Sequence, residues 1–423
     1  MLTSREYLFT PPRPYQLDLN SFDVEDRLQM AVEHSERGEP WTEFMRQPRA
    51  VLLHDSELIQ KVLVRNRNGF TKDVHPFRVL KPLLTTPGAH ALGLAQERVA
   101  SAREALDELV ATASREFTHA LRTHALQAVT TLEVDLFPAL SKSLFVLMGK
   151  VLFDASLEVH AEEFFMASMR HEDFLAIRRR RENARQLSQS EQKEFSCALE
   201  AQDAIARVIL TRFPQEKRES LEAVPDISPE RALIRTLLNS YAGSATTLWW
   251  SLLMLAQHPA AQADLAQQIC LKSVDARTSV KAWVQETLRL YPAAWMISRR
   301  VAPEGDSGGP PFLPGTHVFI CPYTVHRSPQ FWKCPEQFDL GRFLPPRDSD
   351  IAPASYLPFG IGPAACPGSR LAMQILVAYL YPLVRDFTWA LKSGCKLTPF
   401  PRVALRPNPS VSVHVALRSS ARV

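Results

Sequence analysis

One cysteine stands in the stretch of this sequence best suited to chemistry. Residues 359–368 read FGIGPAACPG, so Cys366 lies among three glycines and two prolines, and the apolar helical pattern SRLAMQILVAYLYPLV follows at once. A loop with such small side chains brings backbone N–H groups together, and the helix after it adds the positive end of its dipole. Both favour an anion, so we expect a Cys366 thiolate; the alternative is a buried structural cysteine in a turn.

Three charged residues upstream could form an ion network. Glu286 and Arg289, in ETLR, are three residues apart and share a helix face, where a single pair is ordinarily a surface ion pair of a few tenths of a kcal/mol. Arg342 follows Arg289 by 53 residues, in PEQFDLGRF. This Pro/Phe-rich turn could dock on the pair and supply a second guanidinium for Glu286.

The elements that must position these residues are mostly helical. Ser228 as N-cap and Pro229 at the first helical position predict a helix of about 30 residues, roughly 45 Å long, which ends at His258-Pro259. Helical patterns cover 94–212, and a later helix carries ETLR and is closed by Pro292. Asp55 is expected to cap a helix after the strand AVLLH.

Short strands are expected in three places, and they set the fold class. The segments THVFICPY and SVSVHVAL are strand-like, and we expect a β-rich minor lobe from parts of 40–70, 293–325 and 395–420. No linker divides the chain. The sequence predicts a single domain over residues 1–423, mainly α with a small β region.

Composition narrows the class of function. The net charge of +4 on 423 residues is too small to argue for nucleic acid, and the run from Arg178 to Arg181 is typical of a solvated helix face. The six cysteines show no regular framework, which favours free thiols in a reducing cytoplasm. The first twenty residues lack an apolar run of signal or membrane-span length. We therefore expect a soluble, bacterial-type cytoplasmic protein without a membrane anchor.

The order ETLR, PEQFDLGRF, FGIGPAACPG, with Cys366 following Arg289 by 77 residues, resembles the cytochrome P-450 superfamily of haem-thiolate monooxygenases. The resemblance includes the long predicted helix with AGSATT at 242–247 and the stretch YTVHRSP, and it covers most of the chain. It implies the cytochrome P-450 fold, with the long central helix over the haem, and haem b as cofactor.

The resemblance assigns roles to the cysteine loop. Cys366 would be the axial thiolate ligand of the haem iron, and Phe359 would pack on the thiolate side of the haem. Gly360, Gly362 and Gly368 would allow close backbone approach. Glu286, Arg289 and Arg342 would form a buried ionic triad with a structural role.

The haem propionates need cations, and here the sequence departs from the family. Arg299 stands where the family usually carries one, although it could be a surface arginine. Arg103 matches a second cationic position, but Val99 replaces the aromatic or His residue four positions earlier. Ala364 replaces the Arg or His that usually precedes the ligand cysteine by two residues.

In the long helix, Thr246 matches the threonine that helps hydrogen-bond bound oxygen, and in the family that threonine interrupts the helical ladder. Otherwise Thr246 would bond back to the preceding turn. Gly243 would let substrate or oxygen approach the helix closely. Ala245 replaces the usual acid, so protons would arrive through Thr246, Ser244, ordered water or the substrate.

These residues imply a monooxygenase that inserts one oxygen atom of O₂ into a lipophilic small molecule, with secondary metabolism as the expected setting. Electrons would come from a separate ferredoxin or flavodoxin with its NAD(P)H reductase, and we expect a monomer. The alternatives are a peroxide-using or oxidative-coupling haem-thiolate enzyme, and a catalytically weak haem- or ligand-binding module.

A zinc site is a further alternative. Cys321, His326 and Cys334 with His317 are borderline-soft ligands within 18 positions, but their spacing is irregular.

Overall fold

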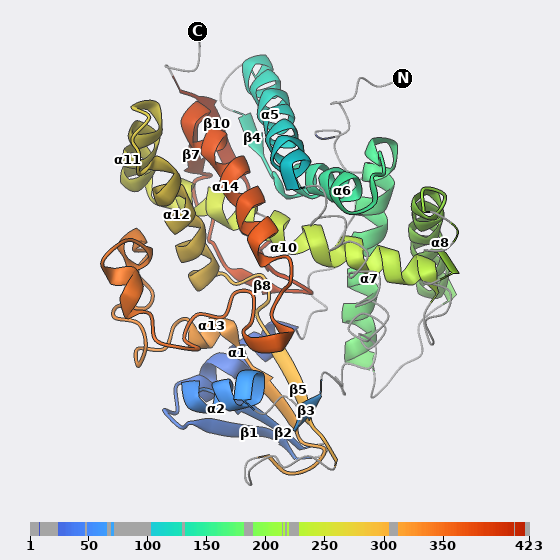
Figure 1. Ribbon diagram of the computed structural model, residues 1–423, viewed down its shortest axis with the longest axis vertical. Coiled ribbons are helices and arrows are strands. Elements are labelled where there is room, and N and C mark those ends of the chain that lie inside the picture. The colour runs from blue at the N-terminus through green and yellow to red at the C-terminus, as the bar shows by residue number, and fades with distance from the viewer. Residues whose placement is uncertain are drawn as a thin grey trace.

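A long helix, α10 (Pro229–Gln257), crosses the middle of the computed structural model (Figure 1). It begins as the sequence predicts, because the Ser228 hydroxyl accepts a hydrogen bond from the Arg231 N–H and Pro229 occupies the first helical position. It ends at His258, before Pro259. Both predicted ends of this helix are confirmed.

The structure describes part of the chain. The described residues are 8, 24–46, 49–65, 69–71, 103–128, 132–181, 189–213, 215, 218–219, 228–303, 312–409 and 411–418. Val99 and most of the Pro-rich stretch 71–92 lie outside them. For Arg103, and for the run from Arg178 to Arg181, only the backbone is described.

Helices surround α10 on several sides. It contacts α6 and α8 toward its N-terminal end and α12 and α14 beyond its middle, as Figure 1 shows. The other helices of ten or more described residues are α1 (Val24–Ser35), α5 (Arg103–Gln127), α6 (Phe137–Phe153), α7 (Ala161–Arg181), α8 (Gln189–Leu210), α11 (Pro259–Cys270), α12 (Ala276–Leu290) and α14 (Ser369–Asp386). The mainly helical class is confirmed.

A five-stranded sheet forms a lobe at the bottom of Figure 1. Its order is β1–β2–β6–β5–β3, and β2 pairs in parallel with β6 whereas the other pairs are antiparallel. The strands are β1 (Trp41–Arg46), β2 (Arg49–Leu53), β3 (Phe70–Thr71), β5 (Ile297–Val301) and β6 (His317–Ile320).

The segment after β2 begins as expected and continues differently. Asp55 caps α2 (Ser56–Gln60) through its carboxylate, which accepts the N–H groups of Glu57 and Leu58 at 2.9 Å. The next turn, η3 (Lys61–Arg65), is a π-helix, which the sequence does not reveal. Short turns follow β6: α13 (Pro322–Val325), η6 (Leu340–Phe343), η7 (Arg347–Asp350) and η8 (Gly362–Ala364).

The C-terminal strands differ from the expected lobe. β10 (Val413–Leu417) pairs with β4 (Leu132–Val134) and β7 (Phe387–Leu391) at the opposite end of the molecule from the lobe (Figure 1). β8 (Pro399–Pro401) and β9 (Leu405–Pro407) form a separate hairpin. Residues 395–420 therefore add no strand to the five-stranded sheet, although Leu405 of β9 packs with Ala50 and Phe319 of that sheet.

The β8–β9 hairpin is held by buried polar contacts from distant elements. Trp250 of α10 donates its indole N–H to the Leu405 carbonyl at 2.7 Å. Arg402 contacts Asp173 at 2.6 Å, and Arg406 bonds both carboxylate oxygens of Glu172 at 2.7 and 2.6 Å. Since Asp173 and Glu172 belong to α7, two ion pairs fasten this hairpin to α7.

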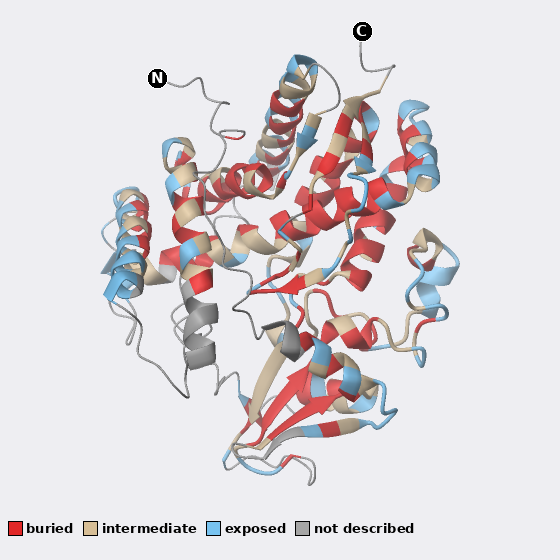
Figure 2. Ribbon diagram, turned by 180° about the vertical axis from the view of Figure 1, so that it is seen from behind, coloured by how far each residue is buried: buried red, intermediate tan, exposed pale blue. Residues whose placement is uncertain are grey.

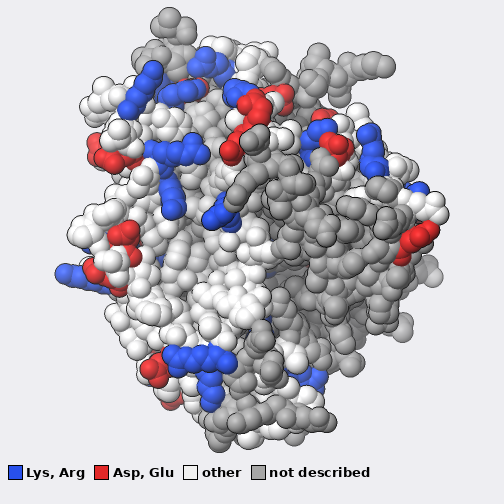
Figure 3. All heavy atoms as spheres, viewed as in Figure 1, with Lys and Arg blue, Asp and Glu red and all other residues white. Residues whose placement is uncertain are grey.

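Burial is concentrated where helices face one another, as Figure 2 shows. The largest apolar cluster joins α5, α6, α10, α12 and α14. One smaller cluster lies within the lobe, and another joins the lobe to Leu405 of β9. Among the described residues, no helix is both long enough and apolar enough to cross a bilayer. On the face in Figure 3, basic and acidic side chains are interspersed.

Candidate functional site

The cysteine loop is shaped by two glycines in left-handed conformations. Gly360 has φ +69° and Gly362 has φ +73°, values that side-chain-bearing residues rarely adopt. A Cβ on Gly362 would also collide with the Leu63 carbonyl of η3, so the loop lies directly against that π-helical turn. The Cys366 N–H donates to the Phe359 carbonyl at 2.8 Å, which closes the loop before α14 begins.

The Cys366 residue itself is exposed, and its thiol is not acidified by the loop alone. Burial by surrounding protein raises the pKa of the thiol, and the Gly368 N–H opposes that shift. The Gly368 N–H thus favours the thiolate, as expected of the loop, whereas burial opposes it. A positively charged metal ion at the sulfur would supply what the backbone does not, because coordinating thiols are deprotonated.

Phe359 and Gly368 flank this cysteine in different ways. Phe359 is half-buried and packs against the large helical cluster, so one side of the loop is anchored in the core. A Cβ on Gly368 would lie 3.9 Å from the Cys366 sulfur, which is an ordinary contact. Gly368 is therefore not required by sterics in the way Gly362 is.

The threonines of α10 differ in their bonding. Thr247 donates its hydroxyl to the Gly243 carbonyl at 2.8 Å, the back-bond expected of a helix-interior threonine. Thr246 is fully buried, and its hydroxyl has no hydrogen-bond partner among the described residues. α10 is continuous through this point, so the expected interruption of the ladder is not seen. The back-bonding interpretation is thus wrong for Thr246 and holds for its neighbour.

The other candidate residues of the AGSATT stretch differ from Thr246 in position or in side-chain chemistry. Ser244 precedes Thr246 by two residues, which places the two side chains about 200° apart on the helix. Ser244 therefore does not share the Thr246 face. Ala245 is buried and brings no carboxylate. A Cβ on Gly243 would meet Ala293 at 3.8 Å, an ordinary contact, so the approach of substrate or oxygen at Gly243 stays a prediction.

Arg299 is the described residue that best suits an anionic group. It lies on β5 and donates to the Ser298 carbonyl at 2.8 Å, and within the described ranges it has no carboxylate partner. Burial lowers the pKa of its guanidinium, with no acidic neighbour opposing the shift. Ala364 ends η8 and offers no charge. Arg103 begins α5, but its side chain lies outside the described residues.

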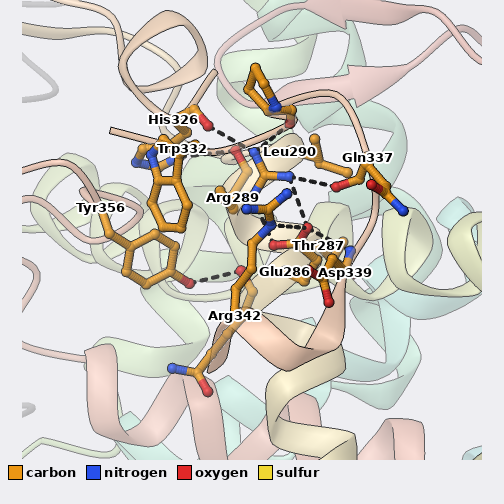
Figure 4. A network of polar contacts seen from close by, with 12 residues as sticks. Glu286, Thr287, Arg289, Leu290, His326, Trp332, Gln337, Asp339, Arg342 and Tyr356 are labelled. Atoms are coloured by element: carbon orange, nitrogen blue, oxygen red, sulfur yellow. Dashed lines mark hydrogen bonds and ion pairs between the residues drawn. The ribbon is translucent and has the colours of Figure 1, made fainter. Parts of the chain in front are cut away.

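The structure brings Glu286, Arg289 and Arg342 together (Figure 4). Arg289 makes a two-pronged contact with Glu286 at 2.7 and 2.8 Å, whereas Arg342 Nε lies 3.5 Å from Glu286 Oε1. The Asp339 N–H also donates to Glu286 at 2.9 Å. Burial raises the pKa of Glu286, although both guanidiniums favour its carboxylate. These are contacts of a structural network.

Arg289 also binds the loop that follows α13. Its guanidinium donates to the carbonyls of His326, Pro335 and Gln337 at 2.7–3.1 Å. Trp332 lies beneath both arginines, at 5.2 Å from the Arg289 guanidinium and 6.0 Å from that of Arg342. The network therefore fixes the loop after α13 on α12.

His326 is a link in this network and not a metal ligand. Its Nε2 accepts the Leu357 N–H at 2.6 Å, so the proton is on Nδ1, which donates to the Arg289 carbonyl at 3.0 Å. Both ring nitrogens are thus committed. Within the described part of the chain no group of three His, Cys, Asp or Glu side chains could hold a metal ion. The zinc alternative, with His317, Cys321 and Cys334, is not supported.

Together these residues fit an iron porphyrin. The glycine loop presents a thiol ligand, Arg299 offers a cation to a propionate, and the unbonded Thr246 hydroxyl is on the central helix, which contacts α14 directly behind the loop. Residues 163–415 match the family model described as Cytochrome P450. The chain belongs to this family. Membership implies haem b with a cysteine thiolate as axial ligand.

Relatives of this cytochrome P450 match it over part of their lengths. Cyclooctatin synthase of Streptomyces melanosporofaciens is 27% identical over 215 residues, which is 49% of this chain and 45% of that protein. Cytochrome P450 3A6 of Oryctolagus cuniculus is 34% identical over 194 residues, 43% of this chain and 38% of that protein. The matched part is thus less than half the length of either relative.

Solved structures show the same fold across nearly the whole chain. CYP175A1 from one Thermus thermophilus strain has a TM-score of 0.72 at 22% identity, covering 93% of this chain and 96% of that one. A 6-coordinated cytochrome P450 from another strain of Thermus thermophilus has a TM-score of 0.69 at 20% identity, covering 93% of this chain and 99% of that one. The cytochrome P450 fold expected from the sequence is confirmed.

Several structural residues were not found from the sequence. Trp332 has no local motif, and its place under two guanidiniums depends on a turn far along the chain from α12. Arg402 and Arg406 were likewise not predicted to bind α7. His326 carried a signal in YTVHRSP, but the sequence alone did not connect it with Arg289.

Proposed function

We propose that this cytochrome P450 is a haem-thiolate monooxygenase that inserts one oxygen atom of O₂ into a lipophilic small molecule. The observation that carries the proposal is the Cys366 thiol, exposed at the end of a glycine loop and immediately before α14. A bound haem would supply the chemistry of oxygen activation, and Cys366 would hold its iron as a thiolate. The second oxygen atom leaves as water, which requires two protons and two electrons.

The chain's own residues have separate parts in this proposal. Cys366 holds the iron, and Arg299 pairs with a propionate. The Thr246 hydroxyl would hold a proton for the reacting oxygen, because it is buried without another partner among the described residues. Ser244 is directed away from Thr246, so the second proton comes through water or a polar group of the substrate.

Partners and setting belong to the same proposal. Two electrons per turnover come from a separate ferredoxin or flavodoxin and its NAD(P)H reductase. All six cysteines are free in the structure, which supports a reducing cytoplasm. We expect a monomer, and the partial match to cyclooctatin synthase supports a setting in secondary metabolism.

The test is the spectrum of reduced protein with carbon monoxide. We expect the far red-shifted Soret band of thiolate ligation in wild type and its loss in Cys366→Ala. Cys270→Ser is the matched control, because Cys270 is also exposed and lies at the end of α11, outside the cysteine loop. A Soret band typical of histidine ligation in wild type would contradict the proposal. So would the red-shifted thiolate band if it persisted in Cys366→Ala.

One observation favours a second candidate, a peroxide-using enzyme. Because residue 245 is alanine, no carboxylate stands beside Thr246 in the sequence to deliver protons. Hydrogen peroxide is already reduced by two electrons and carries two protons, so its use would not need that carboxylate. Turnover with peroxide alone that equals turnover with the electron-transfer system would favour this candidate. Absence of product with either oxidant, for every compound that perturbs the haem spectrum, would favour a binding module.

A further inference from the structure

Arg235 of α10 is a buried cation that the proposed mechanism does not use. The residue is 2% exposed, and its Nη1 has no hydrogen-bond partner among the residues that the structure describes. Within the described residues it forms no ion pair. Burial lowers the pKa of this guanidinium to about 10, and no neighbouring carboxylate opposes the shift. Arg235 therefore remains charged at neutral pH.

The arginine one turn earlier shows what an ordinary arrangement looks like. Arg231 reaches α8, where it bonds Asp203 at 2.6 Å and the Leu199 carbonyl at 3.2 Å. Arg231 is also less buried, with 28% of its side chain exposed. In the described part of the chain, the more exposed cation of this helix face is thus paired and the more buried one is not, although an unpaired buried charge is strongly unfavourable.

The position of Arg235 on the helix relates it to the oxygen-side residues. Residues 242 and 246 each lie within about 20° of residue 235 on the α10 surface, on either side of it, because seven and eleven residues are close to two and three whole turns. Along the axis, Arg235 precedes Thr246 by about 16 Å. One stripe of α10 therefore carries a cation at one end, Ala242 between, and the unbonded threonine at the other end.

We propose that Arg235 binds an oxyanion of the substrate, so that the substrate is an amphiphilic acid whose apolar body extends along α10 toward Thr246. A carboxylate or phosphate monoester accepts two parallel N–H bonds from a guanidinium, and the apolar Ala242 suits a hydrocarbon between the two ends. This inference rests on the proposed function, since it names the substrate class for the same site.

Binding to the ferric holoenzyme tests the ligand class. The probes are dodecanoic acid, dodecyl phosphate and dodecanol, together with adamantane-1-carboxylic acid and 1-adamantanemethanol. Titration calorimetry and the Soret shift should show the acid of a pair binding roughly tenfold to a hundredfold more tightly than its alcohol, the range of charge-assisted hydrogen bonds. Arg235→Met should abolish this preference, Arg235→Lys should keep part of it, and Arg231→Met should keep all of it.

Thermal unfolding of the same variants, without ligand, separates binding from structure. If Arg235 is reserved for a substrate, Arg235→Met removes an unpaired buried charge and should raise Tm by a few degrees. If Arg235 pairs with a carboxylate of its own chain outside the described residues, Tm should fall. Arg231→Met should lower Tm slightly, because it breaks an existing ion pair.

Three results would overturn the inference: acids and alcohols that bind alike, a panel in which no acid binds, or an Arg235→Met protein of lower Tm. The relative affinities of carboxylate and phosphate decide the kind of oxyanion. The preference for acids over alcohols is measured by calorimetry, and this measurement requires neither turnover nor a thiolate band in the spectrum. Failure of the proposed function is therefore seen separately, in the carbon monoxide spectrum.

Discussion

Thr246 and Thr247 are adjacent, yet one hydroxyl is bonded within the helix and the other is not. The difference follows from their orientation, since Thr247 reaches the Gly243 carbonyl whereas Thr246 has no partner in the described structure. A buried hydroxyl without a partner costs free energy, so its retention favours a role in binding or proton transfer.

We therefore expect Thr246→Ala to lower product formed per NAD(P)H several-fold, because protons delivered wrongly release the oxidant as peroxide. Substrate affinity should be nearly unchanged. Thr247→Ala is the matched control. It should lose about 1 kcal/mol of stability because the hydrogen bond to the Gly243 carbonyl is lost, but the amount of product formed per NAD(P)H should stay normal. Product, NAD(P)H and peroxide are measured together. Efficient turnover with hydrogen peroxide that is unchanged in Thr246→Ala would contradict the monooxygenase proposal.

His326 makes the folding stability of the protein depend on pH. Burial lowers its pKa to about 3, and the ring donates to Arg289 and accepts from Leu357 in its neutral form. In the unfolded chain the pKa is about 6.5, so as pH falls below about 6.5 the unfolded state takes up a proton that the native state does not. Stability from this residue is present above pH 6.5 and is lost as pH falls toward 3.

Unfolding free energy measured from about pH 7 to about pH 4 should show this. Removing the residue in His326→Gln should reduce the pH slope by about 1.4 kcal/mol per unit in the middle of that range, corresponding to one proton. His119→Gln is the control, because His119 lies on α5, away from this network. An unchanged slope in His326→Gln would show that His326 is protonated in the native state.

At the scale of elements, much of the architecture could be predicted because the signals are local. Asp55 and Ser228 cap helices through their own side chains, and proline fixes the start of α10. The Glu286 contacts were also foreseen, since ETLR and PEQFDLGRF are separated by a characteristic spacing. The part of Ser244 in proton delivery stays a prediction, although two helical residues turn the side chain by about 200°, which places Ser244 and Thr246 on different faces of α10.

Other elements depend on contacts that leave no local trace. The π-turn of η3 lies against Gly362, which is distant in sequence, and the short β4 strand has only β10 as partner among the described strands. The unpaired state of Arg235 also could not be inferred from the sequence, because arginines on helix faces are ordinarily solvated or paired. Such features are set by tertiary packing, which overrides local propensity.

The network on α12 yields a prediction about folding. Glu286→Ala leaves Arg289 and Arg342 buried without their shared carboxylate, a loss of about 3 to 5 kcal/mol for a broken buried network. We expect little folded, haem-loaded protein. Glu336→Ala is the control, since Glu336 is 72% exposed in its ion pair with Arg327 and should matter little. Expression yield and haem content are measured, and a fully loaded Glu286→Ala protein would contradict the network's role.

At the scale of the whole molecule, ion pairs join segments that are far apart in the chain. Arg406 and Glu172 are each 13% exposed and link the β8–β9 hairpin to α7. Arg406→Ala should lower stability by about 3 kcal/mol, because it leaves a largely buried carboxylate unpaired.

Hydrogen exchange in α7 should rise in Arg406→Ala, and the charge exchange Glu172→Arg with Arg406→Glu should restore part of the protection. The exposed pair of Lys392 and Glu133 serves for comparison, and Lys392→Ala should change stability by less than about 1 kcal/mol. Equal effects of Arg406→Ala and Lys392→Ala would show that the hairpin is not fastened to α7 by this pair.

The parallel pairing of β2 with β6 has a consequence for how the protein is made. Strand β2 (Ala50 to Leu53 in this pairing) cannot pair with β6 (His317 to Ile320) until β6 has been synthesised. At roughly 5–20 residues per second, a ribosome needs about 13 to 50 s to reach β6. During that interval the apolar strand AVLL has an open edge, which is a template for aggregation. A chaperone that covers β2 on the nascent chain should therefore raise the yield of folded protein more than one supplied after release.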